Sequence, residues 1–248
     1  MVMRAMLPAL NLDPPAACAL CDEPAPPLLG WRDFADSCND AFLAPGERTF
    51  PRCGVALPYH RCARCGLLFT AALDGWDAAA FRAHIYNDDY LRADPPFVSE
   101  RPTRNAHMVA GLWHHEKGRS TVLDFGGGAG TFAAALRALG LSCDSCDAFY
   151  GAPPPARRYP IITSFEVIEH TPHHGQRAWL AELAAHLEPG GVVLLSTALL
   201  PADAPIDHWY IGPRNGHISV HSERSLQLLA RGCGLQLVSL NSQTHLLR

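Results

Sequence analysis

The sequence predicts an α/β fold built on a sheet of buried parallel strands, and three observations support that prediction. The apolar run 121–125 suits a strand that is buried on both faces. A glycine-rich turn follows it at once, and residues 132–139 then place apolar side chains at helical spacing until Gly140 ends the helix. With 248 residues, 48% of them hydrophobic, the chain can bury a sizeable core, which indicates one large domain and a small one.

Charge and hydropathy exclude several classes of partner. The formal charge of −4 gives the chain no general attraction for nucleic acid or for an anionic membrane. No run of about 18 apolar residues occurs. The N-terminal stretch Met1–Leu12 is interrupted by Pro8 and lacks the pattern of a signal peptide. We therefore expect a cytoplasmic protein without a nucleic-acid or membrane partner, and the sequence carries no signal for an oligomeric state.

Four of the nine cysteines form two C-x-x-C knuckles, Cys18 with Cys21 and Cys62 with Cys65. In a cytoplasmic chain such pairs indicate a metal rather than disulfides, and four thiolates satisfy tetrahedral zinc in a closed, structural site. The interval between the knuckles is about twice the usual ~15–20 residues, and the alternative is four buried thiols without metal. Cys38 and Cys53 are the substitute ligands if one knuckle cysteine is not used.

The glycine-rich turn contains Gly126, Gly127, Gly128 and Gly130 and follows the acidic Asp124. Glycine permits backbone angles and a close ligand approach that a Cβ would block, and Thr131 can cap the helix that follows. A strand, a glycine turn and a helix in this order are typical of a cradle for a nucleotide cofactor. Any tight turn between a strand and a helix can also use glycines, and the spacing here differs from G-x-G-x-x-G.

The register of residues 123–130 resembles motif I of the class I S-adenosylmethionine-dependent methyltransferases. Residues 141–147 are similar to their second strand, which would end in Asp147 as the acceptor of both ribose hydroxyls. Residues 161–170 resemble their fourth strand and the EVIEH segment after it, and residues 187–197 resemble their fifth strand. The resemblance implies a Rossmann-like sheet and S-adenosylmethionine as the cofactor. The implied cofactor contacts are Asp124, Gly126, Gly128, Gly130, Asp147, Phe165 and Glu166.

One segment departs from the family. Only about a dozen residues separate Asp147 from the strand that begins near Pro160, and residues 153–155 are prolines, which a helix interior excludes. The family places a helix, its third strand and another helix there, so we expect a trimmed sheet without the third strand. Phe149 or Tyr150 would cover the adenine, unless both only fill the missing layer. Cys143 and Cys146 form a further C-x-x-C pair. They would lie on the second strand with their sulfurs on opposite faces, which indicates core packing.

The zinc knuckles followed by this core resemble a bacterial group that includes sugar C-methyltransferases. The resemblance implies a zinc-knuckle module at 1–72, a helical connector at 73–118 that folds over the cofactor, and a Rossmann-like domain at 119–248. In the connector, Tyr86, Tyr90 and Arg101 are the candidates for cofactor contact. The alternative is that the connector's aromatic residues are ordinary core, and we favour this alternative for Trp76 and Phe81.

Candidate catalytic groups gather after the fourth strand, at the edge where open α/β sheets bind ligands. The E-x-x-E-H pattern of Glu166, Glu169 and His170 resembles that of small-RNA 2′-O-methyltransferases and ubiquinone-biosynthetic O-methyltransferases, which hold a divalent metal with a further histidine. His217 is the best match for that histidine, because it precedes Ser222, the expected cap of helix 222–231. Two carboxylates and two imidazoles suit Mg²⁺, Mn²⁺ or Fe²⁺. The alternative is a segment without metal in which His170 packs or acts as a base.

We therefore expect methyl transfer to a small molecule such as a sugar, sugar nucleotide or natural product, with His170, His217 and Glu169 as catalytic residues. The polar and aromatic loop 208–215 would shape the acceptor pocket. Two histidine pairs, His114–His115 and His173–His174, are expected to be solvated at helix ends. A C-methyltransferase of the related group would carry a further C-terminal domain, so the end of the chain at Arg248 favours O-methylation. The alternatives are a sugar C-methyltransferase and a cofactor-binding scaffold without catalysis.

Overall fold

The computed structural model describes residues 7–97, 100–151 and 153–248, and the chain divides into two compact units. The first unit combines Met1–Pro95, Ile168–Arg177 and Ala198–Gly232, and the second combines Pro96–Val167, Ala178–Thr197 and Cys233–Arg248. The two units interleave along the chain, because the segments that follow two strands of the second unit belong to the first. Residues 1–6 of the N-terminal stretch assessed above lie outside the described residues.

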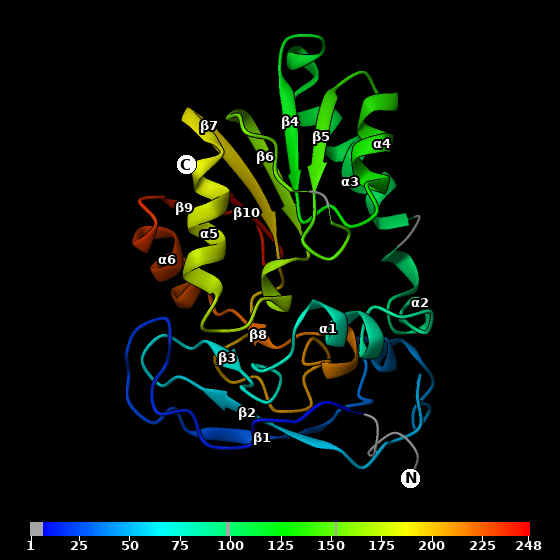
Figure 1. Cartoon of the computed structure of the whole chain (residues 1–248), viewed down its shortest axis with the longest axis vertical. Coiled ribbons are helices and arrows are strands. Elements are labelled where there is room, and N and C mark those ends of the chain that lie inside the picture. The colour runs from blue at the N-terminus through cyan, green and yellow to red at the C-terminus, as the bar shows by residue number, and fades with distance from the viewer. Residues whose placement is uncertain (1–6, 98–99, 152) are drawn as a thin grey trace. The chain divides into compact units, whose positions relative to one another are not determined.

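The second unit contains a six-stranded sheet in the order β5-β4-β6-β7-β10-β9 (Figure 1). Strands β5, β4, β6 and β7 pair in parallel, whereas β10 runs antiparallel to both of its neighbours. This arrangement confirms the expected Rossmann-like sheet. The bounds are β4 Thr121–Phe125, β5 Ser142–Cys146, β6 Tyr159–Phe165, β7 Leu187–Ser196, β9 Leu237–Ser239 and β10 Thr244–Leu247.

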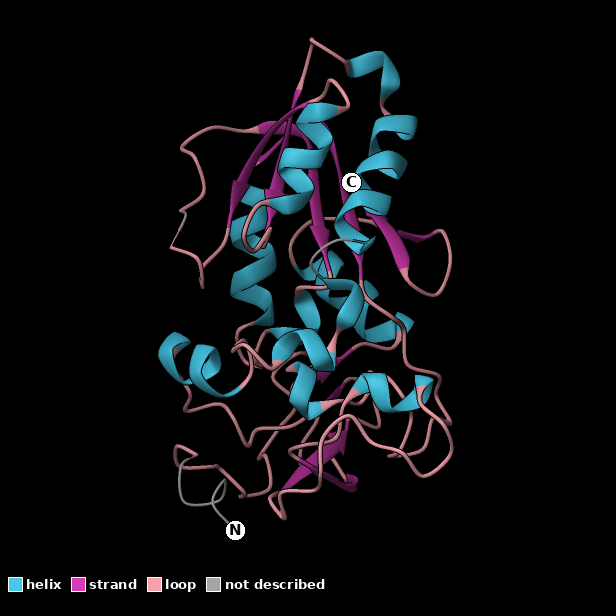
Figure 2. Cartoon of the chain, turned by 90° about the vertical axis from the view of Figure 1, so that its right-hand side faces the viewer, coloured by secondary structure: helices cyan, strands magenta, loops and turns pink. Residues whose placement is uncertain are grey.

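Helices cover both faces of this sheet, as Figure 2 shows. On one face α3 (Glu100–Leu112) and α4 (Thr131–Ala138) pack with Val122 in a single apolar cluster. On the other face the Trp179 ring of α5 (Gln176–Ala185) meets the Phe125 ring at 5.8 Å. Val122 and Phe125 point to opposite faces because side chains alternate along a strand. Cys143 lies in the apolar cluster, as expected of core packing, and burial raises the pKa of both Cys143 and Cys146.

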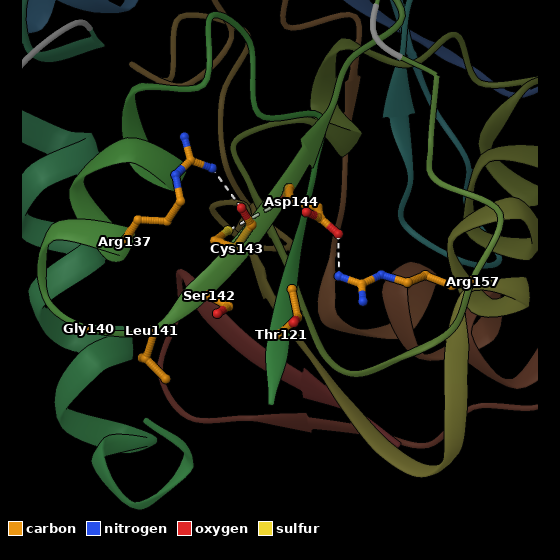
Figure 3. A pocket seen from close by; sticks show the side chains of 8 residues that line it. All are labelled: Thr121, Arg137, Gly140, Leu141, Ser142, Cys143, Asp144 and Arg157. Carbon is orange, nitrogen blue, oxygen red and sulfur yellow. Dashed lines mark hydrogen bonds and ion pairs between the residues drawn. The ribbon is translucent and has the colours of Figure 1, made fainter. Parts of the chain in front are cut away.

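The expected absence of a third strand is confirmed: no described residue between β5 and β6 forms a strand, so β5 is the edge of the sheet. Arg157 covers this edge, donating to Asp144 at 2.5 Å and lying 4.7 Å over the Tyr159 ring. Figure 3 shows the pair beside a shallow depression that Arg137 and the first residues of β4 and β5 also line. An ion pair on an edge strand discourages pairing with another chain. The depression lies at the starts of the strands, away from the ends that bind ligands in such folds.

The first unit contains an antiparallel sheet in the order β1-β2-β3-β8 together with short helices. As expected, Ser222 caps α6, because its Oγ accepts a hydrogen bond from the Ser225 N–H at 3.1 Å. Trp76 and Phe81 are buried against each other as core, also as expected. Among the described helices, none is long and apolar enough to cross a membrane. The bounds are β1 Leu28–Asp33, β2 Ala56–Arg61, β3 Leu68–Phe69, β8 Ser219–Val220, α1 Ala78–His84, α2 Tyr90–Ala93 and α6 Glu223–Gly232.

Candidate active site

The glycine turn between β4 and α4 packs its inner side against a carboxyl group and leaves its outer side open. A Cβ at Gly127 would lie 2.1 Å from Asp124 Oδ2 and 2.3 Å from Ser145 Oγ, so only glycine fits there. Gly128 and Gly130 have φ angles of 55° and 78°, in the left-handed region that glycine adopts without strain. A Cβ at Gly130 would meet no described atom within 4 Å. The turn therefore presents its backbone to a ligand on the open side.

Gly130 itself occupies the N-cap position of α4, and no side-chain hydrogen bond caps the helix. The expectation that Thr131 caps this helix is therefore wrong, because Thr131 is already the first helical residue. The N–H groups at the start of α4 are thus left to water or to a ligand. That arrangement suits an anionic or polar ligand group at this end of the helix.

Asp147 joins the turn to the loop that follows β5. Its Oδ2 accepts a hydrogen bond from the Gly128 N–H at 2.9 Å, and its Oδ1 accepts from the N–H groups of Phe149 and Tyr150 at 2.8 and 3.2 Å. The carboxylate is therefore held beside the open turn at the carboxyl ends of β4 and β5. This is the edge of a parallel sheet at which ligands bind.

Two other cofactor candidates, Asp124 and Phe165, pack inside the second unit. Asp124 is buried, with the hydroxyls of Ser145 and Thr163 each 3.4 Å from its carboxyl oxygens, and burial raises its pKa to about 7. The Phe165 ring packs edge-on against Phe132 at 5.2 Å and belongs to the apolar core. We infer that both residues support the turn from below.

Glu166 follows β6 with an unusual backbone. Its φ angle is 55°, which is uncommon for a residue with a side chain and often marks a functional site. Its N–H donates to the Ser196 carbonyl at 3.0 Å, and its carboxylate accepts from the Ser196 hydroxyl at 2.7 Å. These bonds tie the end of β6 to the end of β7 within the second unit.

The first unit brings together Glu169, His170 and His217, whose ligand atoms all lie within 4.8 Å of one another. Glu169 and His170 end a short 3₁₀ turn, Ile168–His170, while His217 follows a second 3₁₀ turn, Pro213–Asn215, and Gly216. A hydrogen bond from the Ile218 N–H to the Glu169 carbonyl, 3.0 Å long, joins the two segments. Glu166 is not a member of this group, so the expected set of four ligands contains three here.

Hydrogen bonds orient each of the three side chains. His170 Nδ1 lies 3.1 Å from the Gly216 carbonyl and His217 Nδ1 lies 2.8 Å from the Tyr210 carbonyl. Because a carbonyl only accepts, Nδ1 carries the proton in both rings, and Nε2 is the nitrogen that could ligate a metal ion. The Tyr210 hydroxyl donates to Glu169 Oε1 at 2.5 Å. Metal-bound histidines in proteins are oriented by the same kind of bond.

The donor set of this cluster fits a divalent cation. Two imidazoles and one carboxylate match the ligands of open Fe²⁺ sites and also suit Mn²⁺, with further positions left for water or a substrate. Glu169 is fully buried, where a carboxylate needs hydrogen bonds or a counter-charge. The same groups without metal would provide a histidine base beside a carboxylate.

Aromatic rings extend from this cluster to the surface of the first unit. The Tyr210 ring lies 4.3 Å from His217, Trp209 lies 5.1 Å from Tyr210, and the exposed Phe42 lies 6.1 Å from Trp209. Phe42 was missed in the sequence, because it is far from this loop along the chain and belongs to no motif. On the other side of the cluster, the Tyr86 ring lies 5.9 Å from His170.

Tyr86 and Tyr90, the expected cofactor contacts, pack together with ring centroids 5.2 Å apart in the first unit. Within the loop 208–215, Arg214 and Asn215 are buried. Arg214 donates to the Ile85 carbonyl, and Asn215 accepts from the Cys38 N–H. Both side chains therefore form hydrogen bonds inside the first unit, whereas this loop was expected to shape the acceptor pocket. Arg101, the remaining connector candidate, lies on α3 in the second unit.

The four knuckle cysteines converge in the first unit, with all four Sγ atoms within 4.8 Å of one another. The Cys18 and Cys65 sulfurs are 3.7 Å apart and the Cys21 and Cys62 sulfurs are 3.5 Å apart. Zn–S bonds of about 2.3 Å in a tetrahedron place the sulfurs at about this separation. The pKa of Cys18 is lowered to about 5, chiefly by the hydrogen bond from Cys65. The cluster is compatible with a structural zinc ion.

The substitute ligands Cys38 and Cys53 are not members of the cysteine group. Cys38 Sγ lies 3.4 Å from His217 Nδ1, and the Cys53 thiol donates to Asp33 at 3.2 Å. The exposed positions of His114 and His115 match expectation, but the same interpretation of His173 is wrong. His173 is buried, and its ring stacks on Phe69 at 4.1 Å.

Comparison with known proteins identifies the class to which this fold and site belong. The sequence profile of the family described as a methyltransferase domain matches residues 97–240, more than half of the chain. The chain therefore belongs to the methyltransferase-domain family, which confirms the class of enzyme expected from the sequence. No curated protein matches the chain.

Several solved structures are similar to the chain. The mitomycin 7-O-methyltransferase MmcR is 14% identical with a TM-score of 0.50, over 70% of this chain and 60% of that protein. An O-methyltransferase family protein from Burkholderia thailandensis is 16% identical with a TM-score of 0.47, over 67% of this chain and 61% of that protein. DesVI of Streptomyces venezuelae is 14% identical with a TM-score of 0.46, over 67% of this chain and 97% of that protein. The likeness to MmcR supports the fold, and the matched region covers about three fifths of the first two proteins.

Proposed function

We propose that this protein is an S-adenosylmethionine-dependent methyltransferase that methylates a hydroxyl group of a small molecule such as a sugar, sugar nucleotide or natural product. The observation that carries the proposal is the open glycine turn held beside Asp147 at the carboxyl ends of β4 and β5. The match to the methyltransferase-domain family supports it. The natural-product O-methyltransferase among the similar structures supports the choice of acceptor class.

Asp147 would bind the ribose of the cofactor. A carboxylate offers about four acceptor positions, and backbone N–H groups take three of them here. One hydroxyl would occupy the remaining position on Oδ2. The second would replace the longest of the present bonds, that from the Tyr150 N–H at 3.2 Å. Phe149 and Tyr150, on the same loop, would cover the adenine.

Methyl transfer to a hydroxyl requires an in-line approach and removal of the hydroxyl proton. We propose that Glu169, His170 and His217 serve this step by holding a divalent cation, Mn²⁺, Fe²⁺ or Mg²⁺. When bound, the cation would lower the pKa of a coordinated hydroxyl. The hydrogen bonds from Tyr210 to Glu169 and from the two Nδ1 atoms to backbone carbonyls would keep the three ligands in place. The exposed rings of Phe42 and Trp209 would contact the acceptor.

The four-cysteine cluster would hold one structural zinc ion. It joins the segments around Cys18–Cys21 and Cys62–Cys65, and the Cys65 N–H lies 3.4 Å from Cys62 Sγ, as in compact thiolate turns. With four sulfur ligands the ion would have no position for a substrate. Its role would be to stabilise the first unit.

Calorimetry with S-adenosylhomocysteine tests the cofactor assignment. We expect Asp147→Ala to weaken binding by about 1.5–3 kcal/mol, because the ribose hydroxyls lose a charged acceptor. Asp13→Ala, which removes an exposed carboxylate outside the site, should leave binding unchanged. Equal affinity in the Asp147→Ala and wild-type proteins would refute the assignment.

A screen for methylated products in small-molecule extracts tests the activity itself. Wild-type protein with S-adenosylmethionine should add the mass of one methyl group to a hydroxyl-bearing compound. Cofactor binding without any methylated product would favour the scaffold alternative. A new carbon-bound methyl group would favour a sugar C-methyltransferase.

A further inference from the structure

A third group of metal-ligating side chains lies in the first unit, outside both the cysteine cluster and the candidate active site. Asp74 lies in the turn after β3, and His173 and His174 lie in the turn before α5. One ligand atom from each of the three lies within 4.8 Å of the others. We propose that Asp74, His173 and His174 form a separate site for a first-row divalent transition ion, of the Zn²⁺, Co²⁺ or Ni²⁺ type.

The distances within the group suit a shared ion. His173 Nε2 lies 3.0 Å and His174 Nδ1 lies 3.5 Å from the same carboxylate oxygen, Asp74 Oδ2. An ion about 2.0–2.2 Å from each ligand atom in a tetrahedron requires separations of about 3.3–3.6 Å. Small side-chain adjustments would therefore bring all three atoms onto one ion. The two imidazole rings are nearly perpendicular, at 87°, so their nitrogens approach the carboxylate from different directions.

The surroundings leave the Asp74 carboxylate without a permanent counter-charge. Among the described residues, its ion-pair partners are the two histidines, which are charged only when protonated. Its second oxygen, Oδ1, is buried and accepts no hydrogen bond from the described residues. Burying such an oxygen is unfavourable, and a nearby dication would offset it.

The His173 ring is already held in position for ligation. It stacks on Phe69 with a centroid distance of 4.1 Å and an angle of 26° between the rings. The side chain is only 9% exposed, and the nitrogen that faces Asp74 is Nε2. Nδ1 has no hydrogen-bond partner among the described residues, so the stacking on Phe69, and not a hydrogen bond from Nδ1, holds this side of the ring.

The ligand count and exposure indicate an exchangeable site. Three protein ligands leave at least one position for water, and mixed imidazole and carboxylate donors favour transition ions over Ca²⁺. His174 is 55% exposed, so the ion could enter from solvent. The site would join two segments 99 residues apart, and one of them continues directly from Glu169 and His170. Occupancy would therefore restrict the segment that carries the candidate catalytic residues.

Titration with Co²⁺ tests the proposal, in full-length protein that retains the zinc of its cysteine cluster as measured by elemental analysis. Glu169→Gln serves as the background, because it weakens the candidate active-site cluster. In this background we expect one Co²⁺ ion to bind, with a visible spectrum that lacks the intense sulfur-to-cobalt bands of a thiolate site. Adding His174→Ala, at an exposed and tolerant position, should weaken that binding at least tenfold. Adding Asp74→Asn, which keeps the size of the side chain, should have the same effect.

The matched control is His115→Ala, which removes an exposed histidine from the second unit and should leave the Co²⁺ isotherm unchanged. The proposal would be overturned if the His174→Ala and Asp74→Asn proteins bound Co²⁺ as the background does. It would equally be overturned if the background bound no Co²⁺, since the histidines would then be simple hydrogen-bond partners of Asp74. Neither outcome depends on cofactor binding or methyl transfer.

Discussion

The two units carry their candidate sites in different ways. In the second unit, the cofactor cradle is made by backbone and one carboxylate from a continuous stretch, residues 121–147. In the first unit, each cluster is made by side chains from distant segments, such as Cys18 and Cys65, which are 47 residues apart. The cradle therefore depends on local backbone geometry, whereas the clusters depend on ligand chemistry and on the tertiary structure that joins their parts.

The largest effect should come from removing a ligand of the cysteine cluster. Cys62→Ser should lose the bound zinc and unfold much of the first unit, because structural zinc binding contributes roughly 10–16 kcal/mol of folding free energy. Elemental analysis and circular dichroism measure the two effects. Cys53→Ser is the matched control, since Cys53 lies outside the cluster and a serine can keep its hydrogen bond to Asp33. Wild-type protein purified without zinc would contradict the prediction.

The next effect should be on catalysis. His217→Ala should lower kcat/KM by roughly 10²–10⁴, equivalent to about 3–5 kcal/mol, by removing either a metal ligand or a general base. If His217 ligates a metal, chelator should abolish the activity and Mn²⁺, Fe²⁺ or Mg²⁺ should restore it.

If His217 is instead a base, chelator should have no effect. The rate should then fall in acid, where histidine is protonated, and that dependence should vanish in the variant. His114→Ala, at an exposed position in the second unit, is the control and should keep full activity. Full activity in His217→Ala would exclude both roles.

Within the cradle, Gly127→Ala should destabilise the second unit by about 3 kcal/mol, because its Cβ would overlap the Asp124 carboxyl and the Ser145 hydroxyl. Gly130→Ala meets no such overlap and should lose only about 1–2 kcal/mol, from its left-handed backbone. Chemical denaturation monitored by fluorescence compares the two. Equal losses would show that the overlap with Asp124 and Ser145 does not set the cost at Gly127.

The smallest effect should be a pH dependence that arises from Asp124. Its pKa is raised by burial from 3.8 to about 7, so between these pH values the unfolded chain is ionised while the folded chain keeps the proton. Stability should therefore decrease as pH rises from about 4 to 7. Asp124→Asn cannot ionise and should lack this decrease, so it should be more stable than the wild-type protein at pH 8. Parallel stability profiles of the two proteins would contradict the assigned pKa.

The sequence predicted the local structure of residues 121–147 well because its parts are neighbours along the chain. The strand, the glycine turn and Asp147 all lie where expected, and prolines 153–155 correctly indicated a sheet without its third strand. Errors arose where a local pattern is compatible with two structures. Thr131, for example, begins the helix that it was expected to cap. His173 was misjudged because a histidine in a turn is usually solvated, whereas the tertiary structure buries this one and stacks its ring on Phe69.

The sequence by itself determined the α/β class, the trimmed sheet, the glycine turn and the residue types of the cysteine and glutamate–histidine clusters, because backbone preferences and ligand chemistry act over short stretches. Only the tertiary structure decided that Glu169, His170 and His217 gather while Glu166 binds Ser196, and that Tyr210 orients Glu169. It also decided that Asp74 meets His173, 99 residues away, and its neighbour His174. Such groupings depend on how segments from distant parts of the chain pack, and no local pattern of residues encodes that packing.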